Sequence, residues 1–302
     1  MKYPIISEER RIQRLQPKKG KLRMVLDTDT FNEIDDQFAV VYALQSSERL
    51  QVEAFYAAPF HNDLSTGPHD GMRKSYEELH KILKLMNRTE VPVYLGSDRY
   101  LPGPEIPVES EGARNLIERA LSSSPEDPLY VVAIGAITNV ASAILMNPDI
   151  IENIVVVWLG GHALHWPDTR EFNLEQDIHA ARVMLDSGVP LVLVPCHGAA
   201  SNLKTTLAEI EAYVKDAGVI GAYLHETFRN CHSDHFAYSR VIWDLAAIAY
   251  LVDDEHTPSV LVASPILSDA ARWSQDGTRH LIRYVRHVER DPIFRDLFRK
   301  LI

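Results

Sequence analysis

Short apolar segments alternate with longer amphipathic segments along most of this chain. The first apolar segment, residues 22–26, has the length and composition of a buried strand, and residues 35–45 place Phe38, Val41 and Leu44 near one helical face. The same pattern predicts further strands at 51–58, 91–95, 129–134, 154–159 and 190–194, and further helices at 71–86, 111–121, 138–146 and 176–186. This alternation predicts an α/β, Rossmann-like fold with a mostly parallel central sheet flanked by helices.

The second half of the chain is richer in helical patterns. They predict helices at 207–215, 219–228, 240–251 and 292–302, with apolar runs at 258–263 and 281–285. The strong pattern begins only at Leu22, so residues 1–20 are expected to be an N-terminal extension. Because neither a low-complexity linker nor an internal repeat divides the rest, residues 21–302 are expected to form a single domain with a helical C-terminal part.

Charge and cysteine content narrow the class of protein. A formal net charge of −11 argues against binding to nucleic acid, which requires a basic surface. Residues 1–23 are basic but lack the apolar core of a secretory signal, and no run of about 18 apolar residues predicts a membrane span. The two cysteines, Cys196 and Cys231, have no metal-site spacing, so a reducing, cytoplasmic location fits best.

The strongest candidate for chemistry is a group of carboxylates directly after the first predicted strand: Asp27, Asp29, Glu33, Asp35 and Asp36. Ligand sites in open parallel sheets form beyond the carboxyl ends of the strands. Clustered carboxylates repel one another unless a cation or protons offset their charge. Oxygen ligands in this number, without a nearby Cys or His, suit Ca²⁺ or Mg²⁺. The alternative is a solvated acidic loop in which Asp35 caps the following helix.

A second hypothesis comes from residues 26–30, Leu-Asp-Thr-Asp-Thr, which resemble the opening motif of haloacid-dehalogenase-type phosphatases. That resemblance would make Asp27 a nucleophile and Asp29 a general acid. It also requires a strand that ends in Ser or Thr, and the apolar segment 191–195 contains neither. The phosphatase therefore ranks second.

Four separate segments, in the right order, resemble the inosine-uridine-preferring nucleoside hydrolase family: the Asp cluster, residues 58–62, residues 131–139 with 159–161 and 171–173, and residues 241–250. They extend over most of the chain. The resemblance implies the nucleoside hydrolase fold and hydrolysis of the N-glycosidic bond of ribonucleosides, or of a related N-riboside, to ribose and free base. It also implies a small nucleoside substrate, a bound Ca²⁺ ion and a homodimer or homotetramer.

The resemblance assigns roles to particular residues. Ca²⁺ would be held by the carboxylates of Asp29, Asp36 and Asp244 and by the main-chain oxygen of Ile134. Asp29 would also take the proton from the attacking water, and Asp27 would orient the metal loop. The residues that would bind the substrate are Asp35, Asn62, Glu171, Asn173 and Trp243.

Two departures from the family pattern affect the site. Five residues, rather than three, separate Asp29 from the pair Asp35 and Asp36, which lengthens the metal loop. Trp243 stands where members that prefer inosine and uridine have a His that helps the base to leave. Trp243 is a candidate to stack on the base, and the histidines of residues 230–235 are candidates to supply a proton. These departures motivate a third hypothesis, a calcium-dependent nucleoside- or sugar-binding protein without catalytic activity.

Overall fold

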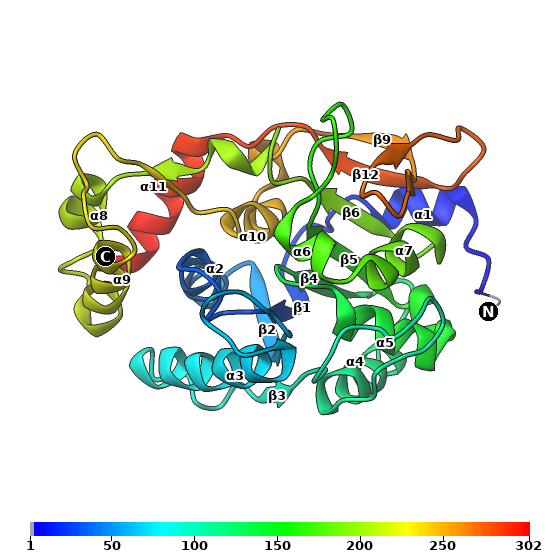
Figure 1. Ribbon diagram of the computed structural model, residues 1–302, viewed down its shortest axis with the longest axis horizontal. Coiled ribbons are helices and arrows are strands. Elements are labelled where there is room, and N and C mark those ends of the chain that lie inside the picture. The colour runs from blue at the N-terminus through cyan, green and yellow to red at the C-terminus, as the bar shows by residue number, and fades with distance from the viewer. Residues whose placement is uncertain (1–2) are drawn as a thin grey trace.

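Within residues 3–302, which the computed structural model describes, an eight-stranded sheet runs through the middle of the molecule (Figure 1). Its order is β3-β2-β1-β4-β5-β6-β12-β9, and neighbouring strands are parallel except for β12 and β9. The strands are β1 (Leu22–Thr28), β2 (Leu50–Ala57), β3 (Val93–Leu95), β4 (Leu129–Ala133), β5 (Ile154–Leu159), β6 (Leu191–Val194), β9 (Ser259–Ala263) and β12 (Leu281–Val285). The predicted α/β class with a mostly parallel sheet is confirmed.

Helices cover both faces of the sheet because its central strands are apolar on both sides. In β1, Met24 and Leu26 belong to one hydrophobic core, whereas Val25 belongs to the core on the opposite face. The helices that contribute to the first core include α2 (Asp35–Gln45), α3 (Pro68–Leu85), α10 (Leu245–Val252) and α11 (Arg290–Leu301). Those of the second core are α4 (Glu111–Leu121), α5 (Thr138–Met146) and α7 (Ile178–Asp186).

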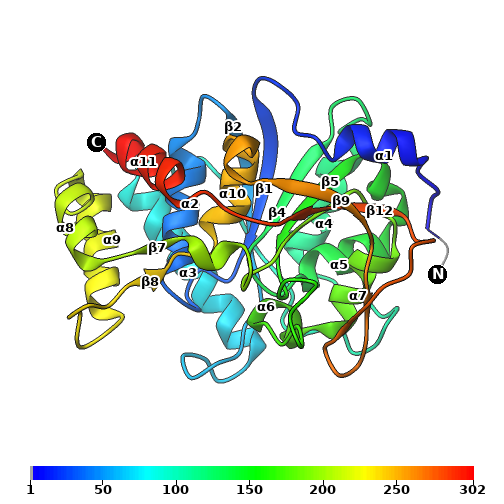
Figure 2. The ribbon, with the colours of Figure 1, turned by 90° about the horizontal axis from the view of Figure 1, so that it is seen from above.

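The remaining elements lie around this body. Figure 2 shows α8 (Leu207–Tyr213) and α9 (Gly218–Asn230) at one end of the molecule, and α1 (Glu8–Arg14) at the other end. The short elements are α6 (Phe172–Gln176), the paired strands β7 (Lys204–Thr205) and β8 (Arg240–Val241), the paired strands β10 (Ile266–Leu267) and β11 (Trp273–Ser274), and the 3-10 helices η1 (Pro148–Glu152), η2 (Ala200–Asn202) and η3 (Asp254–His256). Across residues 3–302, no helix is both long enough and apolar enough to cross a membrane.

The stretch before residue 21, expected as an extension, packs onto the rest of the chain. The guanidinium of Arg11, in α1, donates hydrogen bonds to the main-chain oxygens of Gly188 and Ile6. Leu15 is fully buried in the first core. Residues 6–15 therefore pack against the body of the protein and add a buried side chain to its core.

Two predicted helices differ from those observed. The helix expected at 240–251 begins only at Leu245, because residues before it are held in extended conformation: Arg240–Val241 pairs with β7, and the N–H of Ile242 donates to the oxygen of Leu203 at 2.8 Å. The helix expected at 176–186 begins two residues later, as α7, because Asp177 accepts from the N–H of Ala180 as its cap; the separate short helix before it, residues 172–176, ends at Gln176. In the second half, β9 and β12 also extend the sheet.

Candidate active site

A cavity of about 270 Å³ opens beyond the carboxyl ends of the central strands, where open parallel sheets bind ligands. Polar, acidic and aromatic side chains line it together. The lining residues that bear on the chemistry are Asn32, Asp35, Asp36, Ile134, His162, Arg170, Glu171, Asn173, His197, Trp243 and Asp244.

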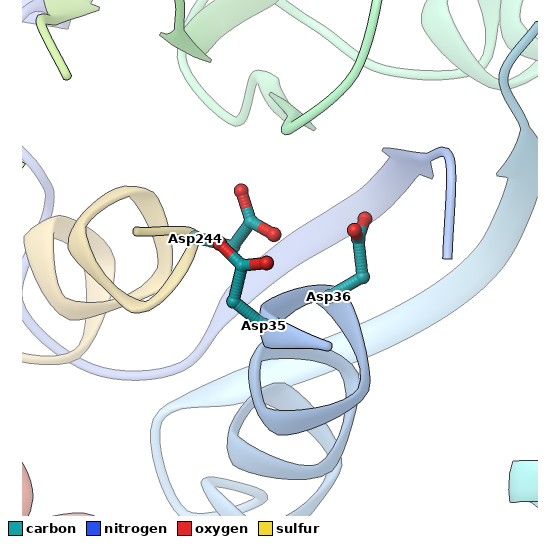
Figure 3. A group of neighbouring side chains, drawn as sticks. All are labelled: Asp35, Asp36 and Asp244. Atoms are coloured by element: carbon teal, nitrogen blue, oxygen red, sulfur yellow. The ribbon is translucent and has the colours of Figure 1, made fainter. Parts of the chain in front are cut away.

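Three carboxylates converge on this cavity from two helices. Asp35 and Asp36 open α2, and Asp244 directly precedes α10. One carboxylate oxygen from each of the three residues lies within 4.8 Å of the others (Figure 3). All three are buried, so the alternative of a solvated acidic loop is wrong. Asp35 also makes no capping bond for α2; its Oδ2 atom accepts instead from the N–H of Trp243 at 3.0 Å.

Burial and mutual repulsion make these carboxylates costly to ionise. Burial raises the pKa of Asp36 to about 7, although a hydrogen bond from Thr28 Oγ1 opposes the rise. The pKa values of Asp35 and Asp244 lie well above their usual range, first because of burial and then because of neighbouring carboxylates. A bound divalent cation would remove this penalty by favouring the ionised forms.

Asp29 lies beneath the cavity rather than in its lining. The residue is fully buried, and within residues 3–302 neither carboxylate oxygen has a hydrogen-bond partner. Gly135 packs against it, since a Cβ at that glycine would lie 3.0 Å from Cγ and Oδ1 of Asp29. Burial, followed by repulsion from Asp36, raises the pKa of Asp29 well above its usual range. Two buried oxygens without partners are the feature expected of groups that await a cation.

The chemistry of these donors fits a hard divalent cation. The described chain supplies four buried carboxylates here, and Ile134 lines the same cavity. The main-chain oxygen of Ile134 accepts from Nδ2 of Asn173 at 3.2 Å. Such a set of oxygen donors suits Ca²⁺ or Mg²⁺ better than softer metals.

Two residues expected to bind the substrate are engaged in the protein itself. The Glu171 carboxylate accepts from the N–H groups of Gly161, Asn173 and Leu174 at 2.8–3.0 Å and so caps α6. Asn62 lies outside the cavity lining, and its Nδ2 atom donates to Oδ1 of Asn32 at 2.6 Å. Asn32, which the sequence did not single out, lines the cavity in its place.

The wall above the carboxylates is aromatic. The Trp243 ring meets His197 edge-on, with centroids 5.2 Å apart, and His197 stacks on Trp166 at 5.8 Å. The His162 and His197 rings are 4.6 Å apart. Neither His162 nor His197 was among the residues predicted from the sequence. The available signal was their position, because they follow Gly160-Gly161 after β5 and Pro195-Cys196 after β6, at strand ends next to the cavity.

Two other candidates lie away from the cavity. Asp27 is fully buried, and its Oδ1 atom accepts from Nδ2 of Asn139 at 2.7 Å. In the 231–239 loop, His232 stacks on Tyr238 and His235 on Phe228. Within residues 3–302, the cavity lining includes neither Asp27 nor any residue of this loop.

Comparison with known proteins identifies related sequences and folds. Residues 24–291 match the family model described as inosine-uridine preferring nucleoside hydrolase. A curated relative, the pyrimidine-specific ribonucleoside hydrolase RihA of Escherichia coli O1:K1 / APEC, is 28% identical over 240 residues, which cover 70% of this chain and 73% of the relative.

Solved structures share the fold. A plant nucleoside hydrolase, the PpNRh1 enzyme, superposes with a TM-score of 0.75 at 18% identity and covers 93% of this chain and 98% of its own. The purine-preferring ribonucleoside hydrolase from Gardnerella vaginalis has a TM-score of 0.76 at 19% identity and covers 92% of this chain and 98% of its own.

Proposed function

This chain belongs to the inosine-uridine preferring nucleoside hydrolase family, and from that premise we propose that it cleaves ribonucleosides with a bound Ca²⁺ ion. As a family member it is an enzyme that hydrolyses the N-glycosidic bond of ribonucleosides. We assign the cation to the carboxylates of Asp29, Asp36 and Asp244 and to the main-chain oxygen of Ile134. Two observations carry the assignment: Asp36 and Asp244 converge with Asp35, and the buried carboxylate of Asp29, close to Asp36, has no hydrogen-bond partner within residues 3–302.

The residues of the chain divide the chemical work. A cation held by these residues would lower the pKa of a water molecule. Asp29 would act as the general base, accepting a proton from the water molecule that attacks the anomeric carbon. The hydroxyls of the ribose donate hydrogen bonds to the carboxylate of Asp35 and to Oδ1 of Asn173, which line the cavity and hold the sugar in a reactive position.

The other residues predicted to bind the substrate either support the cavity wall or line it. Glu171 fixes the 160–174 loop through its three hydrogen bonds, and Asn62 fixes Asn32 at the cavity wall. Trp243 presents its ring to the cavity, where a planar base can stack on it.

Family membership and geometry together set aside the phosphatase hypothesis. Asp27 would have to be an accessible nucleophile, yet it is fully buried and bonded to Asn139. The hypothesis of a binding protein without catalysis is set aside because the family is one of hydrolases.

The decisive experiment measures release of free base from inosine, uridine and cytidine by the wild-type protein and by Asp29→Asn. We expect the variant to lose about 10²–10⁴-fold in kcat, the usual contribution of a general base, while its circular dichroism spectrum is unchanged. Removal of the metal with EDTA should abolish turnover, and added CaCl₂ should restore it. A kcat close to wild type in Asp29→Asn, or turnover that needs no metal, would contradict the proposal.

Assembly and location complete the proposal. We propose a homodimer or homotetramer, as the family resemblance implies, and a cytoplasmic location, which suits the two free cysteines. Light scattering after gel filtration gives the mass in solution, and cell fractionation gives the location.

A further inference from the structure

Departure of the base requires a proton, and the proposed metal residues do not supply one. When the C1′–N bond breaks, its electron pair stays on the base nitrogen, and an unprotonated base leaves as a costly anion. Carboxylates that serve a cation are ionised and cannot donate. The proton must therefore come from another group at the cavity.

We infer that His197 is the catalytic residue that donates a proton to the departing base, an inference that rests on the proposed function. His197 lines the cavity and contacts Trp243, the residue next to Asp244. His197 therefore lines the same cavity as Asp35 and Asp244 and lies beside the Trp243 ring, on which a base can stack.

Two tryptophans fix the orientation of this imidazole. Trp166 lies nearly parallel to it, with an interplanar angle of 8° and a centroid distance of 5.8 Å. Trp243 lies almost perpendicular, at 89° and 5.2 Å. Because the ring is held on two sides, its nitrogen atoms lie in a plane fixed by Trp166. A positioned donor is what proton transfer in a transition state demands.

His162 is the weaker candidate although it lines the same cavity. Its ring is half-buried, and its Nδ1 atom is buried without a hydrogen-bond partner within residues 3–302. Burial and the neighbouring His197 lower the pKa of His162, so it holds a proton less readily than a free imidazole does. His197 is exposed at the rim, where solvent water can return the proton that each turnover consumes.

Cleavage of the riboside conserves atoms, electrons and protons. The C1′–N bond breaks with its electron pair on the base nitrogen, and the proton of the His197 imidazolium forms the new N–H bond. Water forms the C1′–O bond and releases its proton to Asp29. Solvent then reprotonates His197, and Asp29 gives its proton back, so that riboside and water yield ribose and neutral base.

The test compares two kinds of leaving group in the metal-loaded enzyme. Inosine and uridine carry bases that need a proton, whereas p-nitrophenyl β-D-riboside releases a phenolate that is stable without one. His197→Phe keeps an aromatic ring between Trp166 and Trp243 but has no proton to give, and His197→Ala removes the ring as well. His235→Ala is the matched control, a histidine outside the cavity lining.

We expect both His197 variants to lose about 10²-fold or more in kcat on inosine and uridine and to stay within about twofold of wild type on p-nitrophenyl β-D-riboside. His235→Ala should match wild type on all three substrates. Equal losses on both kinds of leaving group, rescue by Phe, or a selective loss in His235→Ala would overturn the inference and leave the proposed function intact. A metal-loaded wild type that cleaves none of the substrates would overturn the proposed function and this inference together.

Discussion

The main-chain N–H of Trp243 donates a 3.0 Å hydrogen bond to Oδ2 of Asp35, a residue 208 positions earlier in the sequence. The bond fixes the residue before Asp244 against the first turn of α2, and so sets the spacing between carboxylates from distant segments. Because the donor is main chain, any residue except proline at position 243 can make it. Tryptophan in place of the family's histidine at position 243 therefore leaves the arrangement of Asp35, Asp36 and Asp244 unchanged.

Asp244→Asn should weaken metal binding. The substitution removes one charged oxygen donor but keeps the size of the side chain. Ca²⁺ at 100 times its Kd stabilises the folded protein by about 2.7 kcal/mol, and we expect the variant to lose at least half of the Ca²⁺-induced rise in Tm under the same conditions. Differential scanning fluorimetry with and without CaCl₂ measures this rise. Glu118→Gln, which neutralises an exposed acid of α4, should keep the wild-type response; a full response in Asp244→Asn would contradict the assigned ligand.

Gly135→Ala should displace Asp29. The new Cβ would lie 3.0 Å from Cγ and Oδ1 of Asp29 and 3.1 Å from Cβ of Ala58, which is tighter than an ordinary packing contact, so the neighbouring groups must shift. We expect the free energy of unfolding to fall by about 1–3 kcal/mol and kcat to fall by about 10²-fold, the effect of a misplaced reacting group.

Urea unfolding and base-release assays measure both effects. Gly277→Ala is the matched control, since a Cβ there meets nothing within 4 Å. Unchanged kcat in Gly135→Ala would show that Asp29 does not need its present position.

The ion pair between Glu33 and Arg240 should position the lengthened metal loop. Arg240 Nη2 lies 2.6 Å from Glu33 Oε2, and the pair links the loop to β8. Both side chains are partly exposed, so we expect a coupling free energy of only about 0.2–1 kcal/mol in a double-mutant cycle of urea unfolding. The effect on kcat/KM should be larger, about tenfold for either single alanine variant, because loop position affects Asp35 and Asp36.

Reversal of the pair, Glu33→Arg with Arg240→Glu, should recover part of the lost kcat/KM. If each alanine variant keeps wild-type kcat/KM, the pair has no part in positioning the loop.

His280 should make the protein less stable in acid. Burial, followed by the nearby Arg11 and Arg279, lowers the pKa of His280 to about 4. The unfolded chain takes up this proton near pH 6.5, so unfolding consumes a proton between about pH 6.5 and 4. The contribution of neutral His280 is therefore fully present above pH 6.5 and is lost as the pH falls towards 4.

We expect His280→Gln to lose less free energy of unfolding than wild type between pH 7 and pH 4.5, by about 1–2 kcal/mol after allowance for partial exposure. Urea unfolding at the two pH values gives the comparison, and exposed His69→Gln serves as the control. Identical pH dependence in wild type and His280→Gln would contradict the prediction.

The central strands were predictable because they are buried on both faces. A short, uninterrupted apolar segment such as Val131–Val132, or Val155 to Val157, is typical of a strand that is buried on both faces. The start of α10 was not predictable, because the apolar pattern of residues 241–250 runs into the helix without a break. Arg240–Val241 instead pairs with β7, the N–H of Ile242 donates to the oxygen of Leu203, and Trp243 lies in a turn held by its bond to Asp35.

Site residues that directly follow strand ends were predictable from the sequence. Site residues whose position depends on the path of a loop were not. Family resemblance led us to expect Asp36 and Asp244 together, and the structure groups them with Asp35, whereas Asp29 lies beneath. The paths of the loops after β5 and β6 bring His162 and His197 into contact, and no spacing in the sequence specifies those paths.

Because the site combines aspartates from the start of α2 and of α10, the order in which the chain is synthesised affects when the site can form. Asp35 and Asp36 leave the ribosome early, whereas Asp244 follows only after most of the sheet has been made. Until then the metal ligands assigned to Asp29 and Asp36 lack their partner Asp244, so a nascent or truncated polypeptide that ends before α10 is expected to bind the divalent cation poorly and release no base.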